Sequence, residues 1–192
     1  MSKRIALLSA AAFGALALTA AVVAPVSAQD KMTKSESGEK TVMVGGAAMF
    51  PSKNIVQNAV NSKDHTTLVA AVKAAGLVDT LESKGPFTVF APTNAAFAKL
   101  PAGTVDTLVK PENKATLTKI LTYHVVPGKL EASDLTDGKK LKTVQGEELT
   151  VKRSGDTVMI IDSKGGSSTV TIPNVNQSNG VIHVVDTVLM PS

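Results

Sequence analysis

The chain has 192 residues, 20 of them basic and 16 acidic, and it contains no cysteine. The missing cysteine excludes a disulfide framework, a zinc site built on thiolates and a thiol nucleophile. The small net charge of +4, five Phe, one Tyr and no Trp argue against nucleic-acid binding, which uses clustered cations and stacking rings.

Residues 1–28 have the pattern of a secretory signal peptide. Lys3 and Arg4 precede an uncharged run over residues 5–24, and a small-residue cleavage motif ends at Ala28. The alternative is a retained membrane anchor, because about twenty uncharged residues can just span a bilayer. Small residues lower the hydrophobicity of the uncharged run, which favours a cleaved signal peptide over a retained anchor. We therefore expect an exported protein, periplasmic or extracellular at the cell surface, with no membrane span after cleavage.

Residues 29–48 are polar and mixed in charge, which predicts a flexible linker. Residues 49–192 show no internal repeat and are expected to form one domain that begins with helices. Ser52 and Asp64 are candidates to cap the first two helices, and Gly76 is expected to end the second in a left-handed conformation. Apolar residues three and four apart give these helices a buried face. Further helices are expected over 77–81, 103–108 and 112–121.

Residues 85–97 form the most informative segment of the chain. Alternating side chains from Phe87 onward predict a strand, and Pro92 ends it because proline has no N–H for the ladder. Thr93 can then cap a short helix that carries Phe97. The segment therefore predicts a strand, a tight turn and a helix in direct succession.

The second half of the chain is rich in predicted strands. Turn residues at Gln145-Gly146, Ser154-Gly155 and Gly165-Gly166 separate short β-branched runs. Strands are expected over 141–144, 149–152, 157–161, 169–172 and 181–189. Helices in the first half and strands in the second predict an α+β fold rather than a repeating βαβ unit.

Three segments carry a family resemblance when they are taken in order. They are residues 85–97, the Tyr123-His124 dipeptide with its flanks at 121–128, and the Asn-Gly-Val-Ile-His-Val-Val-Asp run at 179–186. Together they resemble the fasciclin (FAS1) domain, over roughly residues 49–191. The resemblance implies a compact β-sandwich wedge with several helices packed against it, and it links Tyr123-His124 to cell adhesion. It also implies structural roles for the residues of its first and last boxes, which are Thr93, Asn94, Phe97, Asn179, Gly180, His183 and Asp186.

Two of these motifs have both a functional and a structural interpretation. Tyr123 and His124 either contact a partner directly or use the ring, the hydroxyl and the imidazole to hold a helix-to-strand junction. Thr93 and Asn94 are either polar ligands of an anion at a helix N-terminus or a cap that fixes the turn. We favour the structural interpretation of both.

The sequence offers no catalytic constellation. His65, His124 and His183 are far apart and lack local metal-ligand spacing, so a metal site would need the fold to assemble all three. We expect His65 to be exposed and His183 to be a buried or half-buried imidazole with hydrogen bonds. No nucleophile elbow or phosphate-binding loop is present, and the adjacent Glu147 and Glu148 would point to opposite faces of a strand. No catalytic residue, metal or cofactor is expected.

The sequence therefore indicates an exported bacterial protein without enzymatic activity that acts through surface interactions. The resemblance implies adhesion to a cell-surface or matrix protein or a polysaccharide, with self-association as an open option. One alternative is a periplasmic small-ligand binder, which would show an apolar cavity with convergent polar groups between helices and sheet. Another is a hydrolase, which would need His124 or His183 exposed beside a Ser, Thr or carboxylate. A third is a purely structural envelope protein.

Overall fold

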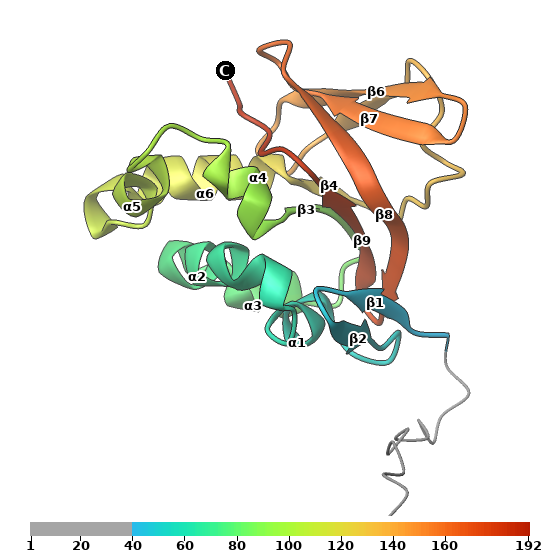
Figure 1. Cartoon of the computed structure of the whole chain (residues 1–192), viewed down its shortest axis with the longest axis horizontal. Coiled ribbons are helices and arrows are strands. Elements are labelled where there is room, and N and C mark those ends of the chain that lie inside the picture. The colour runs from blue at the N-terminus through green and yellow to red at the C-terminus, as the bar shows by residue number, and fades with distance from the viewer. Residues whose placement is uncertain (1–39) are drawn as a thin grey trace, which may run out of the picture. The chain divides into compact units, whose positions relative to one another are not determined.

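The computed structural model describes residues 40–192, which form helices packed on one side of a seven-stranded sheet (Figure 1). The expected signal peptide and most of the expected linker lie outside the described residues.

A small hairpin opens the described part. Its strands are β1 (Val42–Val44) and β2 (Ala47–Met49), joined by two glycines with φ of 58° and 75°. Positive φ at both central positions suits a two-residue hairpin turn. Val44 and Met49 are buried in the main core. The folded part therefore starts earlier than residue 49, and the expected linker boundary was wrong at this end. Burial of Val44 and Met49 holds the hairpin on the core although the residues before it are mostly polar.

Among the described residues, five α-helices and two 3₁₀ turns precede the ten-residue helix α6. The helical elements are α1 (Ile55–Ala59), η1 (Lys63–His65), α2 (Thr66–Ala75), α3 (Val78–Glu82), α4 (Asn94–Ala98), α5 (Thr104–Leu108), η2 (Pro111–Asn113) and α6 (Lys114–Tyr123).

The helix caps agree with the sequence only in part. Gly76 ends α2 with φ of 73°, as predicted. The cap of α1 is Asn54 rather than Ser52, because Asn54 and Gln57 exchange side-chain-to-backbone hydrogen bonds of 2.8 and 3.1 Å in a capping box. Asp64 does not cap α2 either, since it lies within η1.

The strands form one mixed sheet in the order β4-β3-β9-β8-β7-β6-β5. Among these neighbours β3 and β9 run parallel and the other pairs run antiparallel. The sheet also nearly closes, because the Val144 amide just after β5 donates to the Val125 carbonyl of β4 at 2.8 Å. The strands are β3 (Phe87–Pro92), β4 (Val125–Pro127), β5 (Lys140–Lys142), β6 (Glu148–Ser154), β7 (Thr157–Ile161), β8 (Ser167–Gln177) and β9 (Gly180–Val185).

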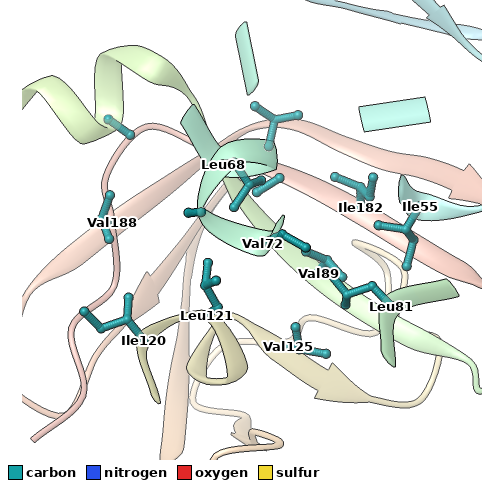
Figure 2. Packing of buried hydrophobic residues seen from close by; sticks show 14 of the residues in the cluster. Ile55, Leu68, Val72, Leu81, Val89, Ile120, Leu121, Val125, Ile182 and Val188 are labelled. Atoms are coloured by element: carbon teal, nitrogen blue, oxygen red, sulfur yellow. The ribbon is translucent and has the colours of Figure 1, made fainter. Parts of the chain in front are cut away.

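Two apolar cores lie on the two faces of the central strands. Val89 of β3 and Ile182 of β9 face the helices with Leu68 and Val72 of α2, as Figure 2 shows. Phe90 belongs to the second core, which the folded sheet encloses with side chains of β5, β6 and β7. The long β8 pairs with both β9 and β7 and so joins the two halves of the sheet. This arrangement gives the expected α+β fold, with the sandwich made by one sheet folded over itself.

Candidate functional site

The His124 imidazole is locked inside the fold by its two nitrogens. His124 ends α6 and is 2% exposed. Nδ1 lies 2.9 Å from the Ile120 carbonyl, and Nε2 accepts a 2.9 Å hydrogen bond from the Leu189 amide. These partners define a neutral ring with its proton on Nδ1. Burial lowers the pKa of His124 to about 4, against its ordinary 6.5, so the ring stays neutral at physiological pH and ties the helix end to the C-terminal segment.

Tyr123 points into the second core, away from the contacts of its neighbour. Its side chain is fully buried, and its hydroxyl accepts a 2.8 Å hydrogen bond from the Ser163 amide. The hydroxyl also lies 3.4 Å from the Glu148 carbonyl. Burial raises the pKa of Tyr123. The hydroxyl thus holds the start of β6 and the turn after β7 rather than the junction itself, and neither residue of the Tyr-His motif presents a side chain to solvent.

His183 has a comparable structural setting in β9. The ring is fully buried and stacks on Phe90 with centroids 5.7 Å apart. Nε2 lies 2.8 Å from the Leu130 carbonyl, and Nδ1 accepts from the Asn174 amide at 3.4 Å. Burial lowers the pKa of His183. The predicted buried, hydrogen-bonded imidazole is confirmed, and it supports a β8 residue, Asn174, whose φ is 56°.

The turn after β3 caps two helices. Thr93 accepts from the Ala96 amide at 3.2 Å, which confirms it as the N-cap of α4. Asn94 reaches across to α2, where its Oδ1 accepts from the Thr67 amide at 3.0 Å and its Nδ2 donates to the Lys63 carbonyl at 2.9 Å. Asn94 therefore supplies the N-terminal cap that α2 lacks locally. Phe97 anchors α4 in the main core.

The β8–β9 turn fixes the ends of two short helices. Asn179 is buried; its Oδ1 accepts from the Ile55 amide at 3.1 Å and its Nδ2 donates to the carbonyls of Leu81 and Ser83 at 2.6 and 3.1 Å. The next residue must be glycine, because a Cβ on Gly180 would lie 2.0 Å from the Phe87 carbonyl oxygen. This close approach starts the parallel pairing of β3 with β9.

Asp186 fastens the end of β9. Its Oδ1 accepts from the Thr169 amide at 2.8 Å, and its Oδ2 lies 3.4 Å from the Lys99 ammonium. Partial burial acts to raise the pKa of this carboxyl, but the hydrogen bonds from Thr169 and Thr187 and the nearby Lys99 hold it below its usual value. The backbone hydrogen bond gives Asp186 a structural role at the end of β9.

The expected exposure of His65 was wrong. The ring is 3% exposed, its Nδ1 lies 2.9 Å from Ser62 Oγ, and its Nε2 has no hydrogen-bond partner among the described residues. Burial lowers the pKa of His65, while the Ala91 carbonyl and Asp64 act in the opposite direction. The η1 turn directs the ring inward. A signal was available in the sequence, since His65 precedes Leu68 and Val72 by three and seven residues and so lies on the buried face of α2.

The structure does not bring the three imidazoles together as ligands. Within residues 40–192 there is no group of three or more His, Asp or Glu side chains placed to hold a metal ion. Both nitrogens of His124 and of His183 are already hydrogen-bonded to backbone groups. Neither ring is therefore placed to take a proton from a nucleophile.

An apolar pocket lies beneath α2, between α1, α3 and the strands β3 and β9. It has an empty volume of about 790 Å³ with its open mouth included, of which about 50 Å³ admits the centre of a water-sized sphere. Figure 2 shows Leu68, Val72, Val89 and Ile182 converging on this region. The polar residues of the lining are His65, Lys73 and His124. Sequence reasoning named such a pocket as an alternative but could not place it.

The fold and these contacts define an α+β domain whose motif residues act as internal ties between helices, loops and a folded sheet. Comparison with known proteins identifies the family: residues 63–191 match the Fasciclin domain, and the chain belongs to that family.

Bacterial relatives extend the match over most of the chain. The chain is 49% identical over 160 residues to "Protein sll1483" of Synechocystis, covering 83% of this chain and 86% of the relative. It is 37% identical over 195 residues to "Immunogenic protein MPB70" of Mycobacterium bovis, covering 97% and 96%. It is 40% identical over 153 residues to "Cell surface glycolipoprotein MPB83" of the same species, covering 77% and 64%.

A solved structure supports the fold independently of close sequence identity. A FAS1 domain pair from the insect cell adhesion molecule Fasciclin I matches with a TM-score of 0.66 at 20% identity, covering 73% of this chain and 52% of the other. None of the helices between residues 40 and 192 has the length and hydropathy needed to cross a bilayer.

Proposed function

We propose that this protein is an exported, non-enzymatic module that attaches to a partner at the cell surface or in the surrounding matrix. The observation that carries the proposal is membership of the fasciclin family together with 40% identity to a protein named as a cell surface glycolipoprotein. The signal-peptide pattern of residues 1–28 supports export to the periplasm or beyond. The hydrogen-bonded imidazoles of His124 and His183 support a role without catalysis.

The contact surface must then use residues other than the Tyr-His motif. The outward face of β5 and β6 is our candidate, because buried Leu141 and Val151 alternate there with exposed lysines. Lys142 and Lys152 are exposed on this face, and Lys140 pairs with Glu148 at 3.4 Å. An excess of positive charge suits an anionic polysaccharide or an acidic protein surface.

Cell retention tests the proposal. The full chain is incubated with cells of the organism that produces it, before and after removal of surface polysaccharide, at several salt concentrations. Saturable retention that weakens with salt and disappears on stripping supports the proposal and assigns the partner class. Retention that survives stripping points to a surface protein, whereas no retention under any condition contradicts surface attachment.

A further inference from the structure

The pocket beneath α2 contains a buried polar atom with an unused hydrogen bond. The Ala91 carbonyl interacts with the ring, but no group among the described residues lies at good hydrogen-bond geometry to His65 Nε2, although the ring is 3% exposed and lines the pocket. Buried polar atoms of native proteins are nearly always paired, and an unpaired one is unfavourable. The apolar neighbours of the ring offer no side-chain partner, so a ligand that brings one would complete the site.

The pocket follows one stripe of α2. Lining residues lie at positions 65, 68, 69, 72 and 73, which are spaced three and four apart and therefore share one helix face. At 1.5 Å per residue, the eight steps from His65 to Lys73 span about 12 Å. Lys73 is exposed and has no salt bridge within the described part of the chain. The stripe thus has a buried polar atom at one end, apolar wall in the middle and an exposed cation at the other end.

The shape and polarity of this stripe select the ligand. Only about 50 Å³ of the pocket admits the centre of a water-sized sphere, so an unbranched chain enters it with the least displacement of the lining. A charged group at the buried end is disfavoured, because the lining supplies no opposite charge there. The proton of the His65 ring can sit on either nitrogen, depending on which way the Ser62 hydrogen bond runs. A hydroxyl can pair with Nε2 in both cases, because it donates and accepts.

We propose that this pocket binds an unbranched apolar molecule with one neutral oxygen, such as a medium-chain alcohol. Its hydroxyl lies at His65 Nε2, and its chain runs along Leu68 and Val72 toward Lys73. The site is separate from the outward face of β5 and β6, so ligand binding and surface attachment can be tested independently.

Binding of 1-octanol to the full chain tests the proposal, with octane and octanoate as the comparison probes. Nitrogen NMR of the imidazoles gives a direct readout, since the sequence has three histidines and His183, which does not line the pocket, serves as the internal reference. We expect saturable octanol binding with a shift of the His65 Nε2 resonance and an unchanged resonance of His183. We also expect His65→Leu to reduce the preference for octanol over octane by about tenfold, the effect of one lost hydrogen bond.

A matched pair of variants separates pocket binding from adsorption at the surface. Val69→Phe places a ring in the pocket from a half-buried position, whereas Val60→Phe makes the same change at an exposed position outside it. We expect Val69→Phe to weaken octanol binding at least about tenfold and Val60→Phe to leave it unchanged. If Val69→Phe does not fold, Val56→Phe replaces it, because Val56 is also half-buried in the lining.

Three results would overturn the proposal. The first is saturating octanol without a shift at His65. The second is equal octanol binding by the Val69 and Val60 variants. The third is tighter binding of octanoate than of octanol that is lost when Lys73 is replaced. That result would place the carboxylate beside Lys73 and leave no ligand oxygen at the His65 imidazole.

Discussion

His124 makes the stability of this protein sensitive to acid, and the structure sets the size of the effect. The buried ring donates from Nδ1 to the Ile120 carbonyl and accepts at Nε2 from the Leu189 amide, so the native state needs the neutral form. Burial lowers the pKa of His124 to about 4, whereas the unfolded chain keeps the ordinary value of 6.5. Between these two values the unfolded state binds a proton that the native state does not.

The sign and the magnitude follow from linkage. Because the native pKa is depressed, the stabilisation is fully present above pH 6.5 and is lost as the pH falls toward 4. A difference of about 2.5 pH units at about 1.36 kcal/mol each corresponds to about 3 kcal/mol of unfolding free energy. The lowered pKa values of His65 and His183 act in the same direction.

Urea unfolding at several pH values between 7.5 and 4, followed by circular dichroism, measures the effect. His124→Gln is the matched variant, since an amide can donate and accept but does not titrate in this range. We expect the variant to be less stable at pH 7.5 and to lose about 3 kcal/mol less than the wild type on acidification. Parallel pH profiles for the two proteins, or an NMR titration of His124 near pH 6.5, would show that the native state does not need a neutral His124.

Two further substitutions test the internal ties. Asn94→Ala removes the cap of α2 and should lower the unfolding free energy by about 1–2 kcal/mol. The control Asn61→Ala loses one exposed hydrogen bond to the Gln57 carbonyl and should lower it by less than about 0.5 kcal/mol. Equal losses for the two variants in urea unfolding would contradict the role of Asn94. Gly180→Ala should lower the unfolding free energy by about 3 kcal/mol or more, because its Cβ would meet the Phe87 carbonyl. Gly103→Ala should lower it by about 1 kcal/mol, since φ is 80° there but the surrounding space is open. Similar melting temperatures for the two variants would show that the close approach at Gly180 is unimportant.

The features that were predictable from the sequence are those that local chemistry decides. Gly76 at a helix end, Thr93 after Pro92 and the alternation of β7 depend on neighbours within a few residues. The order of three short motifs was also sufficient to indicate the family and its α+β fold. These signals need no knowledge of what packs against them.

The missed features depend on partners distant in the chain. Asn94 caps a helix that begins 28 residues earlier, and Asn179 holds Ile55 across 124 residues. The burial of the His65 ring was missed because its immediate neighbours are polar, although its spacing from Leu68 and Val72 places it on the buried face of α2. The β1–β2 hairpin folds because Val44 and Met49 meet the core, although the surrounding sequence has the composition of a linker.

The proposed surface role is tested most directly by cell retention of Lys142→Glu/Lys152→Glu, compared with Lys84→Glu/Lys110→Glu. All four lysines are exposed, so both double variants change the net charge equally and should fold. We expect the first variant to lose most of its retention, by about tenfold in affinity, and the second to keep the retention of the wild type. Unchanged retention of the first variant, or an equal loss in both, would contradict attachment through the outward face of β5 and β6.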